Sequence, residues 1–204
     1  MRLFGKGRAA GGWGIVFVVI LLISAAMVSL PTGAETGTKI ASFYKAHGSL
    51  IALQQILGAI AVAPFVAFAL SIGPNRWLKP VVAVFVAFEL ATNAIPLVMV
   101  AMSNLSADTA HTLTVVEDFA DAGLFASVAA FAIVATMGDS LWIRAIGIAV
   151  AIACVARAVA GPLGIGALDF VAPLALIAFV LLLSLRLLLG ADKGGRARPA
   201  ARRA

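Results

Sequence analysis

A carboxylic acid and a carboxamide lie inside an apolar stretch that is long enough to cross a membrane. Residues 81–102 are apolar apart from Glu89, Thr92 and Asn93. A helix rises about 1.5 Å per residue, so this stretch crosses a hydrocarbon core of about 30 Å and places Glu89 near its middle. A charge at that depth costs at least ~2.5 kcal/mol, so Glu89 must be protonated, paired or in contact with water. Because Glu89 and Asn93 are four residues apart, they share one helix face, which we expect to point into a bundle.

A second group of charges follows in the next two apolar stretches. Asp118 and Asp121 are three residues apart, and Arg157 interrupts the stretch after them. An arginine in hydrocarbon is usually stabilised by a carboxylate inside the bundle. Both aspartates are expected at the depth of Arg157, and Asp169 is a further candidate partner. The predicted ligand- or proton-binding residues are therefore Glu89, Asn93, Asp118, Asp121 and Arg157.

Two interpretations of these residues stay open. Ionisable groups inside a membrane commonly form a path or a site for a proton, an ion or a small polar ligand. The alternative is a structural ion-pair network that fixes the register of the helices, with Glu117 and Asp118 at the membrane interface. The first interpretation requires that Glu89→Gln abolishes activity, whereas the second requires that it weakens folding.

The two histidines could bind a haem together, or a metal ion with the help of carboxylates. His47 and His111 are expected at the outer ends of the second and fourth spans, at comparable depth. Haem ligands in helical bundles are buried, whereas these two residues are expected at or beyond the interface. We therefore favour solvated histidines and predict no cofactor and no metal site. Because no nucleophile–base set, phosphate-binding loop or HExxH pair occurs, no catalytic residue is predicted and an enzyme is the less favoured class.

The composition is that of a membrane protein. Of the 204 residues, 63% are hydrophobic and 12% are charged. That charged fraction is about half of the fraction in soluble domains. The apolar residues occur in six blocks with short polar breaks between them, which is typical of a multi-pass helical membrane protein. The alternation expected of membrane β-strands does not occur. The predicted fold class is therefore an all-α, six-span transmembrane bundle.

The blocks also predict the domain organisation, a single transmembrane domain over residues 1–189 and a basic, disordered cytoplasmic tail over residues 190–204. The six predicted spans are about 13–30, 50–72, 81–102, 112–137, 145–161 and 170–189. The second and fourth helices are expected to begin before their apolar parts, near Ile40 and Ala107. A cleaved signal peptide is the alternative for the first block. It is less favoured because the block is longer than a usual signal core and Ser29-Leu30-Pro31 is a poor cleavage site.

The basic residues predict the orientation of the chain. With both ends on one side, that side carries twelve of the fifteen bases, namely Arg2, Lys6, Arg8, Arg76, Lys79, Arg144, Arg186, Lys193, Arg196, Arg198, Arg202 and Arg203. Cytoplasmic segments are enriched in Lys and Arg, so we expect both termini in the cytoplasm and the protein in a bacterial-type cell membrane. The basic ends are expected to contact anionic membrane lipids. Since the bases do not form one binding face, no nucleic acid partner is expected.

Two short motifs resemble those of a known group of proteins. The segment Phe43-Tyr44-Lys45-Ala46-His47 leads directly into an apolar span, and Glu117, Asp118 and Asp121 form an acidic patch that opens the fourth span. In these features the chain resembles uncharacterised bacterial six-helix integral membrane proteins that carry a domain of unknown function. The resemblance implies the six-helix architecture over nearly the whole chain, and it implies no established activity or cofactor.

Two functions from different classes follow from these patterns. We expect a small transporter or ligand-binding membrane protein with a buried carboxylate site. The alternative is a non-catalytic accessory or assembly subunit, which packs against a protein partner in a larger membrane complex. A lipid-facing stripe of small residues, or a partner that co-purifies with the chain, would favour the second function.

Overall fold

A computed structural model describes residues 8–73 and 75–195. The regular structure of these residues consists of α1 (Arg8–Ala25), α2 (Gly37–Ala69), α3 (Leu78–Ala101), α4 (Ala107–Thr136), α5 (Leu141–Ala160), a single 3₁₀ turn η1 (Gly166–Leu168) and α6 (Val171–Gly195). The six α-helices are each long and apolar enough to cross a membrane. The predicted fold class, an all-helical bundle with six membrane-spanning helices, is thereby confirmed.

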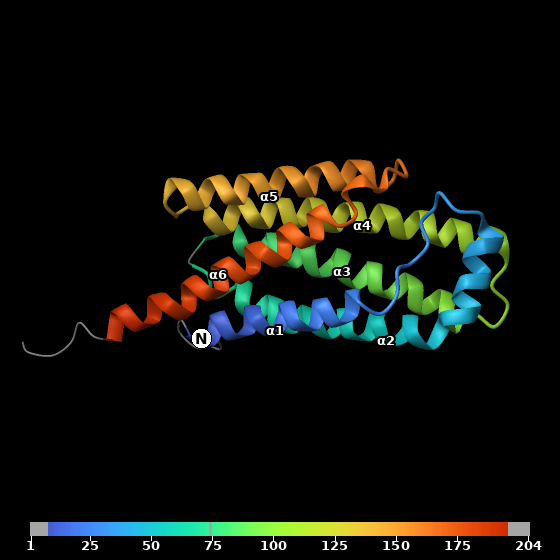
Figure 1. Ribbon diagram of the computed structural model, residues 1–204, viewed down its shortest axis with the longest axis horizontal. Helices are drawn as coiled ribbons and strands as arrows, with labels where there is room; N and C mark the ends of the chain where they lie inside the picture. Colours follow the sequence, from blue (N-terminus) through green and yellow to red (C-terminus); the bar gives the residue numbers. More distant parts are fainter. Residues whose placement is uncertain (1–7, 74, 196–204) are drawn as a thin grey trace, which may run out of the picture.

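Successive helices run in opposite directions along one long axis, so that the start of α1 and the end of α6 lie at the same end of the bundle (Figure 1). We call this the termini end, and we call the end with the 26–36, 102–106 and 161–170 connections the distal end. In the bundle, α4 packs between α3 and α5, α2 packs on α1 and α3, and α6 crosses α1 obliquely. A common end for the two termini agrees with the even number of spans, and the cytoplasmic location of that end stays a prediction.

The first helix ends at Ala25, before the predicted end of its span at Leu30, and a glutamine of α2 satisfies the carbonyl groups released there. The Gln54 amide donates hydrogen bonds to the carbonyl oxygens of Ser24, at 3.0 Å, and of Val28, at 2.8 Å. In return the Ser24 hydroxyl donates to the carbonyl oxygen of Gln54, at 3.1 Å. Carbonyl groups at a helix end need such partners inside a membrane, where water does not supply them. The side chain of Gln54 therefore fixes where α1 stops against α2.

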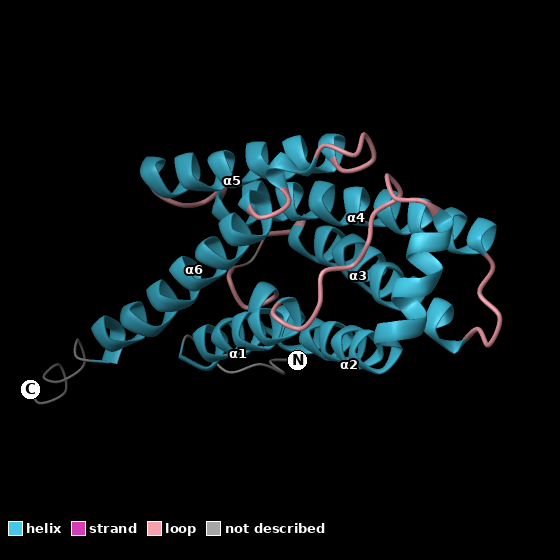
Figure 2. Ribbon diagram, turned by 45° about the vertical axis from the view of Figure 1, so that its right-hand side comes forward, coloured by secondary structure: helices cyan, strands magenta, loops and turns pink. Residues whose placement is uncertain are grey.

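The second and fourth helices begin close to the predicted positions, at Gly37 and Ala107. The hydroxyl of Ser106 caps α4 and accepts a hydrogen bond from the Thr109 N–H at 3.2 Å. The first turns of α2 lie across the distal end before the helix turns along the bundle (Figures 1 and 2). Five buried residues join these turns to α3 and α4 there, namely Ile40, Tyr44, Ile51, Met99 and Ala110.

The last two helices are longer than their predicted spans. α5 begins at Leu141, and α6 continues to Gly195, which takes it into the segment predicted to be disordered. Residues 187–193 are rich in Leu and Ala, which favour helix, and only one glycine interrupts them. The rest of the predicted tail, 196–204, lies outside the described residues, as do Arg2 and Lys6 of the basic N-terminal segment.

A layer of phenylalanine rings fills the bundle in the half nearer the termini end. The ring of Phe65 on α2 lies 5.0 Å from Phe17, 4.1 Å from Phe85 and 5.1 Å from Phe131, between ring centroids. The ring of Phe131 lies 6.2 Å from that of Phe179 on α6. These five buried side chains, which we call the phenylalanine layer, come from α1, α2, α3, α4 and α6. Close packing of this kind holds helices together in lipid. The hydrocarbon chains are as apolar as the side chains, so the hydrophobic effect does not drive the helices together there.

Replacing Gln54 should destabilise the junction of α1 and α2. We expect Gln54→Leu to lower the free energy of unfolding by about 2 kcal/mol, because two buried carbonyl groups lose their donor. Gln55→Leu is the matched control, since Gln55 is 7% exposed against 8% for Gln54 and makes no side-chain hydrogen bond among the described residues. Thermal unfolding in one detergent measures both variants, and an equal loss in the two would contradict the capping role.

Candidate functional site

An ion triad around Arg157 forms the charged centre of the bundle. The Nη2 atom of Arg157 lies 2.9 Å from Oδ2 of Asp121 on α4, and its Nε atom lies 3.1 Å from Oδ1 of Asp169. The side chains of Arg157 and Asp121 are 14% and 22% exposed, so both charges are largely withdrawn from the surroundings. The sequence predicts Asp121 as a partner because it lies at the depth of Arg157, and it names Asp169 as a further candidate. The guanidinium group also lies over the ring of Phe125, 5.5 Å from its centroid.

Two glycines allow the connection after α5 to fold back over this guanidinium. Gly164 has a φ of 70°, a conformation that favours glycine. Gly161 lies against the guanidinium, and a Cβ atom at Gly161 would overlap Nη1 of Arg157. The Nε contact with Asp169 lacks the angle of a hydrogen bond, and Nη1 has no acceptor among the described residues. Arg157 is thus neutralised by two carboxylates, while its hydrogen-bonding capacity is only partly used.

Asp118, which the sequence suggested as a partner of Arg157, bonds the backbone of the α1–α2 connection instead. Its Oδ2 atom accepts a hydrogen bond from the Gly33 N–H at 2.8 Å. From the same helix, the Nε2 atom of His111 lies 3.1 Å from the carbonyl oxygen of Gly33, a contact in which the imidazole N–H donates. Two side chains of α4 therefore hold both polar groups of one peptide residue, which attaches the α1–α2 connection to α4.

The histidines do not converge on a common ligand site. Nδ1 of His47 lies 3.1 Å from the carbonyl oxygen of Phe43 within α2, and His111 bonds Gly33 as described above. Both imidazoles are exposed. Among residues 8–73 and 75–195, no group of three or more His, Cys, Asp or Glu side chains is arranged to hold a metal ion.

Glu89 and Asn93 form a hydrogen-bonded pair that faces α2. The Asn93 amide donates to Oε1 of Glu89 at 3.1 Å, and it also donates to the carbonyl oxygen of Glu89. Asn93 is 6% exposed and lies directly on Gly58, where an added Cβ atom would overlap the amide oxygen. The predicted inward orientation of this face is therefore correct. No basic side chain reaches Glu89 in the part of the chain that the structure describes.

Glu117 is a second carboxylate of this region, and Arg157 lies near enough to attract it electrostatically. It makes no hydrogen bond and no ion pair among the described residues, although it lies one turn from Asp121 on α4. One turn in the other direction, Thr114 is 2% exposed, and its buried hydroxyl has no partner either. A buried hydroxyl is usually hydrogen-bonded, so α4 carries polar groups here that folding does not use.

The acids of this region outnumber the bases. The stretches 81–102, 112–137 and 145–161 contain four carboxylates, Glu89, Glu117, Asp118 and Asp121, and a single base, Arg157. That base is already engaged by Asp121 and by Asp169 from the adjoining connection. The remaining negative charge suits a proton or a cation rather than an anion.

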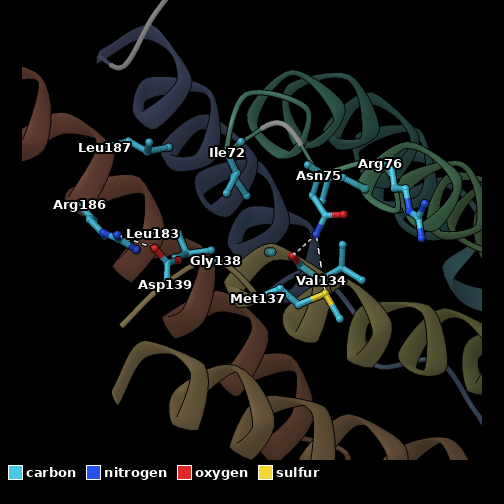
Figure 3. Close-up of a pocket in the computed structure, with 13 residues that line it drawn as sticks. Ile72, Asn75, Arg76, Val134, Met137, Gly138, Asp139, Leu183, Arg186 and Leu187 are labelled. Carbon is cyan, nitrogen blue, oxygen red and sulfur yellow. Dashed lines mark hydrogen bonds and ion pairs between the residues drawn. The ribbon is translucent and has the colours of Figure 1, made fainter. Parts of the chain in front are cut away.

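A cavity opens at the termini end, on the other side of the phenylalanine layer. It has a volume of about 980 Å³ and lies between the α2–α3 connection, the α4–α5 turn and α6 (Figure 3). Along α3, Leu78 lines the cavity, Phe85 belongs to the phenylalanine layer and Glu89 follows one turn later. With a rise of about 1.5 Å per residue, Glu89 lies roughly 16 Å from the level of Leu78. The layer thus separates the cavity from the carboxylates.

Several residues of these sites were not predicted from the sequence. Gln54 and Thr114 lie among apolar neighbours, and a polar side chain inside an apolar block was the signal that could have marked them. The cavity is formed by the oblique course of α6, for which the sequence of α6 gives no signal.

No protein-family model, no curated protein and no solved structure matches the chain. The chemistry of the site is accordingly inferred from the residues that form it.

Removing both carboxylates of the ion triad should cost more than the sum of the two single changes. Asp121→Asn and Asp169→Asn each leave Arg157 with one carboxylate, whereas the double variant leaves a buried guanidinium unpaired, which costs about 3–5 kcal/mol. Thermal unfolding of the wild type, both single variants and the double variant measures the coupling. Losses that add within about 0.5 kcal/mol would contradict a shared role.

The contact between Gly58 and Asn93 predicts a steric effect at one position of α2. We expect Gly58→Ala to lower the free energy of unfolding by about 1–3 kcal/mol, because the new methyl group displaces a packed amide. Gly48→Ala is the control on the same helix, since a Cβ atom there meets only a side-chain carbon of Val100 at 3.4 Å. Adding Asn93→Ala to Gly58→Ala should recover stability in the same assay. If the double variant is no more stable than Gly58→Ala, the steric strain of Gly58→Ala does not come from the Asn93 side chain.

Proposed function

We propose that the chain is a small transporter or ligand-binding membrane protein of the cell membrane, with a carboxylate site for a proton or a small cationic ligand. The observation that carries this proposal is that neither Glu89 nor Glu117 forms an ion pair among the described residues, although Arg157 lies in the same half of the bundle and attracts Glu117 electrostatically. A purely structural network pairs its charges, because an unpaired buried charge is expensive. Carboxylates that folding leaves unused are therefore available for a ligand.

The site residues fall into three groups under this proposal. Glu89, with Asn93 beside it, and Glu117 would hold the proton or the cation. Asp121 and Arg157 would position α4 and α5 around them, because their ion pair joins the two helices. Asp118 would act indirectly, because its hydrogen bond to Gly33 holds the α1–α2 connection against α4.

The position of the phenylalanine layer supports transport in particular. A transporter needs a closed barrier between its binding site and one side of the membrane, and it opens that barrier when the site faces the other side. The layer lies between the carboxylates and the cavity at the termini end. With the termini in the cytoplasm, as the basic residues predict, the cavity would open to the cytoplasm and the carboxylates would lie in the outer half.

The accessory-subunit alternative is favoured by the outer surface of α5. Ala145 and Ala149 lie exposed and four residues apart on that helix, a spacing that lets a second helix approach closely. A partner that co-purifies in fixed stoichiometry, and is lost in Ala149→Leu, would favour this function. In that case Glu89→Gln should leave assembly unchanged.

Infrared difference spectroscopy on the protein in lipid tests the proposed site. Between about pH 5 and about pH 9, the wild type should show the C=O band of a protonated carboxylic acid that changes with pH. The band should weaken in Glu89→Gln or Glu117→Gln and stay unchanged in Asp108→Asn, where an exposed acid in the first turn of α4 is removed. Tetraphenylphosphonium, as a probe cation, should perturb the same band. A spectrum that neither Gln variant alters would contradict the proposal.

A further inference from the structure

The cavity at the termini end is bounded mainly by three parts of the chain. The α2–α3 connection supplies Ile72 and Asn75, the α4–α5 turn supplies Gly138 and Asp139, and α6 supplies Leu183 and Arg186. Its volume of about 980 Å³ lies near the upper limit of the range of about 300–1,000 Å³ that ligand pockets occupy. α6 approaches α4 over only a short stretch, so this wall of the bundle is not closed by helix packing.

The walls of the cavity are apolar and its mouth carries charge. Leu78, Leu183 and Leu187 line it from α3 and α6. At the mouth, Nη2 of Arg186 lies 2.6 Å from Oδ1 of Asp139, and the Arg186 side chain is 47% exposed (Figure 3). Arg76 also borders the cavity, but its guanidinium group lies over the ring of Trp77, on the far side of Asn75 from Arg186 (Figure 3). The base at the mouth is therefore Arg186, and Asp139 is its acid partner.

The hydrogen bonds of the cavity keep its opposite wall in place. The Asn75 amide donates to the carbonyl oxygen of Val134 at 3.0 Å, and the Asn75 side-chain oxygen accepts from the Trp77 N–H at 3.0 Å. The α2–α3 connection is thereby attached to the end of α4, independently of α6 (Figure 3). A molecule that enters between this wall and α6 meets a fixed surface on one side.

Two exposed tryptophans indicate that the mouth would lie near the lipid headgroups. Trp77 ends the α2–α3 connection and Trp142 lies in the first turn of α5, and tryptophan prefers the interface between hydrocarbon and water. The apolar walls reach from this level toward the phenylalanine layer, at the depth of acyl chains. A polar mouth with an apolar interior matches a molecule with an anionic head and a hydrocarbon tail.

We propose that this cavity binds an anionic membrane lipid, with its phosphate at Arg186 and an acyl chain along Leu183 and Leu187. Basic pockets between membrane helices are suited to such headgroups, and an arginine binds phosphate through two parallel hydrogen bonds. The lipid phosphate replaces Asp139 as the partner of Arg186. This site goes beyond the proposed function, because it lies on the other side of the phenylalanine layer from the carboxylates.

Substitutions of Arg186 and Asp139, the two partners of the ion pair at the mouth, should change lipid binding in different ways. The full-length protein is titrated with phosphatidylglycerol or with phosphatidylcholine of the same acyl chains, and bound lipid is counted by native mass spectrometry. Phosphatidylglycerol should bind more tightly to the wild type, and Arg186→Gln should weaken it about tenfold, as expected for the loss of a charge-assisted hydrogen bond. Asp139→Asn should retain or strengthen the binding, because the competing carboxylate is gone. Equal weakening by both variants, or equal binding of the two lipids, would overturn the proposal.

A second pair of variants tests the cavity without disturbing the ion pair. At Gly138, which lines the cavity, and at Gly12 on α1, which does not, an added Cβ atom meets nothing within 4 Å. Gly138→Leu should reduce the binding of phosphatidylglycerol at least tenfold, whereas Gly12→Leu should leave it unchanged. An unaltered affinity in Gly138→Leu would show that lipid does not occupy the cavity. Glycerol 3-phosphate is added at the same concentration as the lipid. If it displaces the lipid, the site binds a free phosphate compound, and the proposal of a lipid site is overturned.

Discussion

The guanidinium group of Arg157 can lie inside the bundle only because two carboxylates meet it from different directions. Asp121 reaches it from α4, and Asp169 reaches it from the connection that leads into α6. An unpaired charge at this position would cost several kcal/mol, so the helices that carry these residues are held in one register. Glu117 lies one turn from Asp121, and the same constraint therefore fixes the direction in which that carboxylate points. The start of α6 is tied to the same guanidinium, because Asp169 lies two residues before that helix begins.

The charges of the bundle serve two different purposes, and the difference lies in their partners. Asp121 and Asp169 are paired with a base, and Asp118 is paired with a backbone N–H group. Glu89 has an amide beside it, in a position that depends on the missing side chain of Gly58. The Asn93 amide supplies no charge, and its N–H group can donate to Glu89 whether that carboxyl group is ionised or protonated, because both forms keep an acceptor oxygen. The paired acids join neighbouring elements, while Glu89 and Glu117, which form no ion pair among the described residues, are the groups proposed to bind a proton or a cation.

The fold was predictable because six apolar blocks with charged breaks admit few other arrangements in a membrane. The pairing of Arg157 was predictable for the same reason, since only carboxylates at its own depth could reach it. The partner of Asp118 was not predictable, because Gly33 lies in an irregular connection whose path depends on how α1 ends. That end depends in turn on Gln54, a contact between helices that local sequence does not encode. The cavity follows from the crossing of α6 over α1, which is set by packing and not by the pattern of apolar residues.

The measurement that most directly tests the division between structural and unused carboxylates is the thermal stability of purified wild type and Glu89→Gln, in one detergent, from about pH 5 to about pH 9. Residues kept for function are often unfavourable for stability, whereas members of a structural network are not. We expect Glu89→Gln to unfold at the same or a higher temperature than the wild type, with a weaker dependence on pH. A markedly lower unfolding temperature in Glu89→Gln would show that this carboxylate holds the helices together, and would contradict a ligand-binding role for it.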